Sequence, residues 1–316
     1  MMYLAHFGLA QPPFKITPHT EFFFTGANRG ATLDALIYAI RTGDGLVKVT
    51  GEVGSGKTML CRVLAERLPE NVETIYLAIP SLTRDEILQA VAADLKLKTK
   101  TLNTSGVLQK IQDHLIKLHS QGRQVVVLID EAHAMPLETL EELRLLSNLE
   151  TNRDKLLQIV LFGQPELEQH LAKPHMRQVK ERITHSFFLQ PIQKKDIGDY
   201  LNFRLRAAGY HGTDVFNERC VAMITAVSKG LSRRINILAD KTLLAAFADG
   251  AYTVEPRHVS AAIADSDFGW RRWWSPAIGW AFGGGIAVAA VALAVWAILP
   301  LQNDIPVTRT ASQSAR

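Results

Sequence analysis

The sequence predicts an α/β fold in which a parallel five-stranded sheet carries helices on both faces, followed by an all-helical domain. Three observations predict it. Up to Pro191, β-rich runs alternate with stretches of helical apolar spacing. A glycine-rich turn joins the first of these runs to a helix, and after Pro191 only helical patterns remain. These patterns place an α/β domain at residues 1–192 and a helical domain at 193–266.

The five expected strands are short runs rich in apolar and β-branched residues. Gln124–Ile129 and Leu157–Gly163 are almost continuously apolar, which is typical of parallel strands buried on both faces. The other three runs are bounded by glycine, proline or polar residues, and they cover 45–50, 73–79 and 185–189.

The helices expected between these strands show apolar residues at spacings of three and four. Thr83 and Thr104 stand where a side chain can cap a helix N-terminus, and Pro69 stops the helix that follows the glycine-rich turn. The predicted ranges are 59–68, 82–95, 104–119 and 136–150.

After Pro191 the helical pattern repeats without an intervening strand. The expected helices cover 196–208, 217–227, 232–248 and 255–264. They amount to a separate helical domain of about 75 residues, which is within the usual domain size.

The C-terminal part has the composition of a membrane span. No charge occurs from Trp273 to Asn303, and a helix over Ile278–Leu299 would be roughly 33 Å long, enough for the ~30 Å core of a bilayer. Tryptophans stand near both ends of this run. We expect a juxtamembrane linker at 267–275, a transmembrane helix at 276–300 and a short non-cytoplasmic tail at 301–316. We expect the large N-terminal part to be cytoplasmic.

Charge and cysteine content exclude several classes of protein. The chain carries 35 Lys+Arg and 31 Asp+Glu, and half of the excess falls after residue 265. The large N-terminal part is nearly neutral, which disfavours a nucleic-acid partner. Cys61 and Cys220 are the two cysteines of the sequence, too few for a disulfide scaffold or a cysteine zinc site.

The glycine-rich turn fits the phosphate-binding pattern G-x-x-x-x-G-K-[ST]. Its backbone N–H groups and the helix N-terminus behind it are suited to cradle phosphates. Lys57 is expected to reach the β- and γ-phosphates of ATP, and the Thr58 hydroxyl to bind Mg²⁺. The expected ligand-binding residues are Gly51, Glu52, Val53, Gly54, Ser55, Gly56, Lys57, Thr58 and Met59.

Two acidic residues directly follow the apolar run 124–129 and form a second motif. Asp130 is expected to hold Mg²⁺, directly or through water, and Glu131 to orient and deprotonate the attacking water. Because the run 73–79 lies between the two motifs in sequence, another strand can sit between the motif strands. Together the two motifs predict ATP hydrolysis.

The segment Asp130-Glu131-Ala132-His133 also matches a helicase-type motif. A helicase of that class needs a second motor domain, and no pattern after Pro191 resembles one. His133 is therefore interpreted as a structural residue.

Several separated motifs occur in an order that resembles one family. They are Tyr3-Leu4, Phe7-Gly8-Leu9, Pro13-Phe14, Pro18, the glycine-rich turn at 51–58, the acidic motif at 130–133 and Gly163-Gln164-Pro165-Glu166-Leu167. Over residues 1–265 the chain resembles the ExeA/GspA-type AAA+ ATPases of bacterial secretion and pilus biogenesis. The resemblance is greatest to the MshM-like branch of MSHA pilus biogenesis.

The resemblance implies further site residues. Gln164 is similar to the residue called sensor 1, and Arg182 to an arginine finger that reaches the neighbouring subunit, with Arg177 as the alternative. Arg233 is similar to the sensor 2 residue of the lid, with Arg234 as the alternative. Such residues imply a homo-oligomer, in the form of a ring.

The resemblance also implies a membrane-anchored ATPase that supports assembly of a type IV, MSHA-like pilus or of type II secretion machinery. Its partners would be inner-membrane assembly proteins and a peptidoglycan-binding protein, besides the lipid bilayer. Two alternatives stay open: a nucleic-acid-dependent switch of the transposition-regulator or replication-initiator kind, and a scaffold that binds ATP with negligible turnover. An intact Glu131 disfavours the scaffold.

Overall fold

The computed structural model describes residues 2–43, 45–78, 82–99, 101–151 and 153–266. Residues up to Asp265 form one compact unit. The predicted linker, transmembrane helix and tail lie outside the described residues, and so remain predictions. Within the described part of the chain, no helix is both long and apolar enough to span a bilayer.

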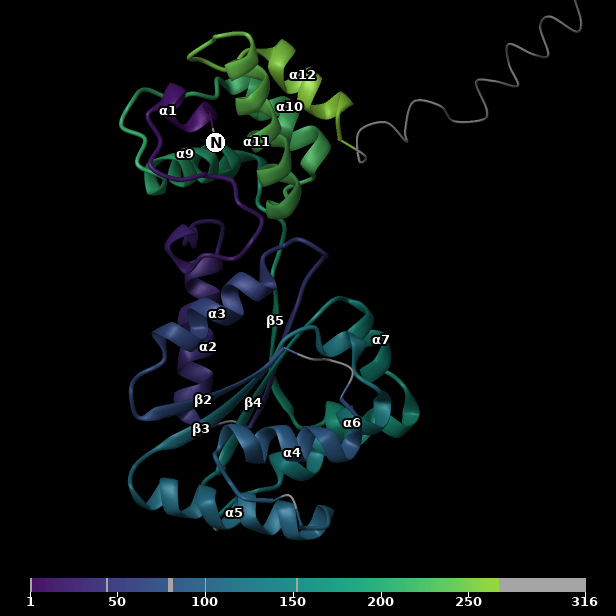
Figure 1. The fold of residues 1–316 in the computed structure, drawn as a ribbon. Coiled ribbons are helices and arrows are strands. Elements are labelled where there is room, and N and C mark those ends of the chain that lie inside the picture. The colour runs from purple at the N-terminus through teal and green to yellow at the C-terminus, as the bar shows by residue number, and fades with distance from the viewer. Residues whose placement is uncertain (1, 44, 79–81, 100, 152, 267–316) are drawn as a thin grey trace, which may run out of the picture. The chain divides into compact units, whose positions relative to one another are not determined.

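The compact unit contains the predicted five-stranded sheet, and every strand pair in it is parallel. Its order is β2-β3-β4-β1-β5 (Figure 1). The predicted ranges of β3 and β4 are confirmed to the residue, and those of the other strands are shifted by one or two residues. The strands are β1 (Leu46–Thr50), β2 (Val72–Leu77), β3 (Gln124–Ile129), β4 (Leu157–Gly163) and β5 (Ile183–Phe188).

The strand β4 lies between β1, which precedes the glycine-rich turn, and β3, which precedes the acidic motif. It pairs with β1 on one side and with β3 on the other, whereas β2 lies at the edge of the sheet. The expectation drawn from the run 73–79 is therefore wrong about which strand intervenes. Sequence order does not fix strand order, because each parallel connection crosses over the sheet through a helix and can return on either side.

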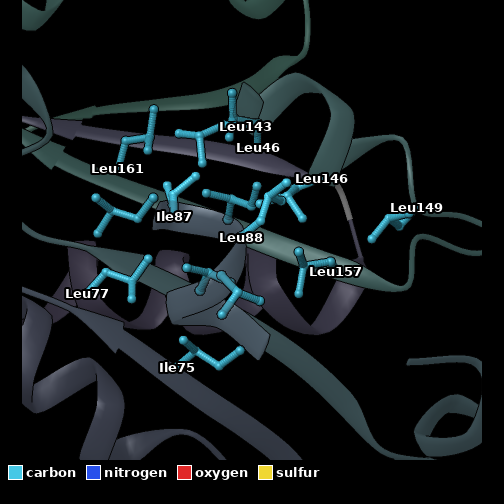
Figure 2. Close-up of a cluster of buried hydrophobic side chains, with 14 of the residues drawn as sticks. Leu46, Ile75, Leu77, Ile87, Leu88, Leu143, Leu146, Leu149, Leu157 and Leu161 are labelled. Atoms are coloured by element: carbon cyan, nitrogen blue, oxygen red, sulfur yellow. The ribbon is translucent and has the colours of Figure 1, made fainter. Parts of the chain in front are cut away.

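Helices cover both faces of the sheet, as predicted. The helices α2 (Arg29–Thr42) and α3 (Lys57–Arg67) share one buried apolar cluster with one face. The other face is covered by α4 (Arg84–Asp94), α5 (Thr104–Ser120) and α6 (Leu137–Ser147). Figure 2 shows side chains of α4 and α6 among those of the strands in this second cluster, including Ile87, Leu143, Ile75 and Leu157.

The helix starts follow local capping chemistry, with one correction to the sequence analysis. Thr83 and Glu86 form the reciprocal capping box that starts α4. Asn103, and not Thr104, caps α5, because its Oδ1 accepts a hydrogen bond from the Gly106 N–H at 2.9 Å. The Thr104 hydroxyl instead donates to Asp85 Oδ1 at 2.9 Å.

After β5 the described chain is helical, and the four predicted helices are present within two residues at each end. They are α9 (Ile197–Ala207), α10 (Glu218–Ser228), α11 (Ser232–Ala248) and α12 (Pro256–Ala264). We call residues 197–264 the helical region. Whether it folds as a separate domain from residue 193 on, as the sequence suggests, stays a prediction.

The N-terminal segment packs against the helical region. Tyr3 donates a 2.6 Å hydrogen bond to Asp240 of α11, and buried Arg204 of α9 donates to the carbonyl oxygens of Pro13 and Lys15. Two helices of this part of the chain and two short helices between β4 and β5 have no counterpart among the predicted elements. These are α1 (Met2–Phe7), α2 as given above, α7 (Glu166–Leu171) and α8 (Arg177–Lys180).

Candidate nucleotide-binding site

A cavity of about 320 Å³ lies where the glycine-rich turn, the ends of two strands, the N-terminal segment and the helical region meet. This position, beyond the carboxyl ends of parallel strands, is where ligands bind in open α/β sheets. About half of the residues that line the cavity are polar or charged, and the others are mainly apolar and aromatic. Its lining includes Val53, Gly54, Gly56, Lys57, Thr58, Met59, Glu131, Gln164 and Arg233.

The glycine-rich turn has the backbone geometry that its sequence predicts. Gly54 and Gly56 have φ values of 77° and 103°, in the left-handed region where a side chain would be strained. The turn then enters α3 at Lys57, so the first N–H groups of an eleven-residue helix face the cavity side of the turn. Glu52 is exposed and Ser55 is fully buried within the turn.

Lys57 is a buried cation held inside the turn. Its Nζ donates hydrogen bonds to the carbonyl oxygens of Gly51 at 2.8 Å and Glu52 at 3.0 Å. Burial lowers the pKa of Lys57, and the carboxylates of Glu131 and Asp130 partly offset that effect. Buried positive charge at a helix N-terminus is an arrangement suited to a polyphosphate.

Asp130 follows β3 and is held by two donors. The Glu131 N–H donates to Oδ1 at 2.9 Å, and the Tyr76 hydroxyl, from the neighbouring strand β2, contacts Oδ2 at 3.4 Å. Asp130 is 4% exposed. Burial raises the pKa of the Tyr76 hydroxyl, and the negative charge of Asp130 raises it further.

Glu131 lies in an unusual backbone conformation. Its φ of 55° is left-handed, which is uncommon for a residue other than glycine and costs of order 1–3 kcal/mol. Its side chain is 43% exposed and lines the cavity, with His133 Nε2 at 3.6 Å from Oε2. Backbone strain of this kind is found at functional sites, where surrounding structure holds it.

The predicted magnesium ligands suit that ion in number and kind. Thr58 supplies a hydroxyl on the cavity wall, and Asp130 supplies a buried carboxylate directly after β3, although it is not among the residues that line the cavity. Magnesium keeps several waters and uses one or two protein oxygens plus substrate phosphates in such sites. Among the described residues, no group of three or more His, Cys, Asp or Glu side chains could hold a metal by itself.

The structure brings two of the three residues implied by the family resemblance into the cavity. Gln164, directly after β4, is on its wall. Arg233, near the start of α11, contacts the turn directly, since its N–H donates to the Gly54 carbonyl at 3.1 Å. A Cβ placed on Gly54 would lie 2.8 Å from the Arg233 Cβ, so only glycine fits there. Arg234 is not among the residues that line the cavity.

Arg182 and its alternative Arg177 do not line the cavity of their own chain. Arg182 lies just before β5, at the opposite end of that strand from the segment leading to the helical region. Arg177 is exposed and pairs with Glu181, with Nε and Oε1 2.7 Å apart. Neither placement tests a role toward a neighbouring subunit.

Several cavity residues carried no recognisable sequence signal, and four of them are polar or charged residues brought by α2, α9 and α11. Arg29 reaches the turn from α2, and Tyr200 and Arg204 come from α9 and Asn236 from α11. The Tyr200 hydroxyl donates to Asn236 Oδ1 at 2.7 Å, a buried pair that links two helices. The motifs Pro13-Phe14 and Pro18 pointed to the N-terminal segment, and Lys15, Ile16 and Pro18 indeed lie close to this group.

Comparisons with known proteins agree with this geometry. Residues 40–171 match a family model described as an AAA domain. General secretion pathway protein A of Aeromonas hydrophila is 39% identical over 262 residues, which are 83% of this chain and 48% of that protein. The chain therefore spans about half the length of this curated relative.

Solved structures share the fold at low sequence identity. The ORC2 protein of Aeropyrum pernix, in complexes with ADPNP and ADP, has a TM-score of 0.61 at 16% identity, over 81% of this chain and 72% of that one. Cdc6p from Pyrobaculum aerophilum has a TM-score of 0.62 at 18% identity, over 80% and 70%. With the site described above, these similarities show that the chain carries an AAA-type ATPase domain and is related to General secretion pathway protein A.

Proposed function

We propose that this protein is a membrane-anchored AAA+ ATPase that hydrolyses ATP to support assembly of type II secretion machinery or of a type IV, MSHA-like pilus. The observation that carries the proposal is the 39% identity to General secretion pathway protein A, which extends over 262 residues and so beyond the AAA domain into the helical region. The membrane anchor rests on the uncharged run from Trp273 to Asn303.

ATP would occupy the cavity with its phosphates at the N-terminus of α3. Lys57 would exchange the two carbonyl oxygens that it contacts for β- and γ-phosphate oxygens. Mg²⁺, held by Thr58 and Asp130, would neutralise developing charge on the phosphates. Glu131 would orient the attacking water and accept its proton, because its carboxylate lines the cavity and is partly exposed.

Gln164 and Arg233 would contact the γ-phosphate, so their positions would depend on whether ATP or ADP is bound. Two hydrogen bonds to the Gly54 carbonyl, from the Arg233 N–H and from the Ser232 hydroxyl, support this role for Arg233, because they join α11 to the turn. The helical region would then act as a lid whose position follows the nucleotide. Arg182 would complete the site of the next subunit in a homo-oligomeric ring.

A complementation experiment tests the proposal. Cells that lack the protein would receive the wild type, Lys57→Ala or Glu131→Gln, with equal amounts of each protein verified in the membrane fraction. We expect the wild type to restore secreted substrate or surface pilin and both variants to fail, since one removes phosphate binding and the other removes the base. Full restoration by both variants would contradict a role for ATP hydrolysis in assembly.

Stimulation by DNA distinguishes the nucleic-acid-dependent alternative. The near-neutral charge of residues 1–265 favours an ATPase whose turnover is unchanged by duplex DNA. A large, salt-sensitive increase in turnover on adding DNA would favour the alternative.

A further inference from the structure

Arg29 is a buried arginine at the first position of α2 that contacts the glycine-rich turn. It is 5% exposed, and its Nη2 donates a 2.9 Å hydrogen bond to the Ser55 carbonyl. The same nitrogen lies 3.5 Å from the carbonyl oxygen of Gln190, in the segment between β5 and the helical region. One nitrogen of this guanidinium therefore touches both the turn and the chain that leads to α9.

The other terminal nitrogen of Arg29, Nη1, is buried and has no hydrogen-bond partner among the described residues. A charged donor left unpaired in the interior costs more than an ordinary unmade hydrogen bond. Burial lowers the pKa of Arg29. The electrostatic effects of Tyr200 in α9 and of Asp196, just before α9, raise the same pKa and partly offset the effect of burial. An arginine keeps its charge in proteins, so this nitrogen remains a strong donor.

Arg29 also lines the cavity, on a wall that it shares with Tyr200, Arg204 and Asn236. A nucleotide offers acceptors along its whole length, on the phosphates, the ribose and the base. A buried cation with a free donor on the wall of such a cavity matches that chemistry. The neighbouring cation Arg204 differs, because its Nε and Nη2 already donate to backbone carbonyl oxygens of Pro13 and Lys15.

We propose that Arg29 is a nucleotide-binding residue whose Nη1 donates a hydrogen bond to the bound nucleotide while its Nη2 holds the glycine-rich turn. The proposal rests on nucleotide binding in this cavity. It adds to the site a contact from the N-terminal segment, outside the two sequence motifs and the residues implied by the family resemblance. The same guanidinium contacts the Gln190 carbonyl, so nucleotide binding should also change the environment of Gln190.

A purely structural role is the competing explanation. On this account Arg29 acts only through its hydrogen bond to the Ser55 carbonyl, with a bound water satisfying Nη1, so that Arg29 supports the turn without touching the nucleotide. In that case substitution lowers the stability of the protein and leaves nucleotide affinity intact. Affinity and stability therefore have to be measured on the same variants.

The test compares Arg29→Met and Arg29→Lys with the wild type and with Arg41→Lys. Arg41 is a matched control because it is exposed on the same helix, about 18 Å along it. Calorimetric titration with Mg·ATP and with Mg·triphosphate would be run where circular dichroism shows each protein folded. We expect Arg29→Met to raise the Kd for ATP roughly ten- to a hundredfold, the range for a charge-assisted hydrogen bond. Arg29→Lys should weaken binding less, and Arg41→Lys should not change it.

The two ligands locate the contact. A loss confined to ATP places the acceptor on the base or ribose, and a loss with both ligands places it on the phosphates; either result supports the proposal. ATP affinity within about twofold of the wild type in folded Arg29→Met or Arg29→Lys would overturn it. Failure of the wild type to bind ATP would instead contradict the nucleotide-binding function itself, so the two failures are distinguishable.

Discussion

At the scale of single residues, the site combines a buried cation with two acids that have different surroundings. Lys57 is enclosed by the turn, and Asp130 is buried and held by a backbone N–H and the Tyr76 hydroxyl. Glu131 is partly exposed and faces the cavity. These environments favour a fixed metal ligand at Asp130 and a reactive base at Glu131.

Glu131→Gln separates binding from hydrolysis. The amide keeps the shape of the side chain but cannot accept the proton of the attacking water. We expect ATP affinity close to that of the wild type and turnover lower by roughly 10²–10⁴-fold, the usual contribution of a general base. Nucleotide titration and a phosphate-release assay on the same preparation measure both quantities; wild-type turnover would remove Glu131 from the role of base.

Cys61 should be chemically inert although it lies in the helix that follows the phosphate-binding turn. It is fully buried, and burial raises the pKa of its thiol, with a further rise from the Asp130 carboxylate. A raised pKa lowers the thiolate fraction at any given pH, and the thiolate is the reactive form. Burial raises the pKa of the buried Cys220 thiol as well.

We therefore expect neither thiol to react with an aromatic disulfide reagent at about pH 8 in the native protein, and both to react after unfolding. Absorbance of the released thiolate, recorded with and without guanidinium chloride, measures this. Rapid labelling of Cys61 in the native state would show that α3 opens locally at the site.

At the scale of secondary-structure elements, helix positions follow capping and burial more than propensity. The helix α5 starts where the Asn103 side chain accepts the Gly106 N–H, and its apolar residues Val107, Ile111 and Leu115 are buried against the sheet cluster. The sequence pattern pointed to Thr104 as the capping residue, one position after the actual cap. Only the backbone geometry at residue 103 decides it.

Asn103→Ala should lower the free energy of unfolding by about 1 kcal/mol, the usual value of a lost N-cap. Thr104→Ala is the matched control, because the Thr104 hydroxyl makes an exposed hydrogen bond to Asp85 and caps no backbone group. It should cost less than Asn103→Ala in a urea titration. Equal losses would mean that the Asn103 cap contributes nothing specific.

At the scale of the whole molecule, the cavity is assembled from segments that are distant in sequence. The N-terminal segment, α3, the ends of β3 and β4, and the helices α9 and α11 each supply residues to it. Because the wall includes the helical region, binding of a nucleotide can be coupled to the position of α11 through Gly54 and Arg233. No residue of this wall comes from α8 or the segment that carries Arg182.

If Arg182 serves the neighbouring subunit, turnover should rise more than linearly with protein concentration, since isolated subunits lack the finger. An arginine finger supplied in trans contributes roughly 10³–10⁵-fold in small GTPases, so even a weaker effect is measurable. Arg182→Ala should bind ATP and be nearly inactive. Mixing it with Lys57→Ala should restore part of the activity, because an intact Lys57 can then face an intact Arg182 across an interface.

The control for this mixture is Arg177→Ala, whose side chain pairs with Glu181 on the surface. It should retain turnover if Arg182 is the finger. A mixture that stays inactive, although mixed oligomers are shown to form, would exclude action of Arg182 in trans and make Arg177 the residue to examine.

The sequence by itself determined the five strands, most of the longer helices and the phosphate-binding pattern of the turn. Gly54, Gly56 and Lys57 are readable because phosphate binding needs residues of fixed type at fixed spacing along one turn, and apolar periodicity marked β3 and β4 to the residue. Only the tertiary structure decided that β4 separates the motif strands, that Asn103 caps α5, and that Arg29, Tyr200 and Asn236 join the cavity. The strand order and the cavity wall depend on which surfaces pack together across long separations in sequence, and local periodicity does not encode such contacts. The cap at Asn103 depends on the local backbone geometry at the start of α5.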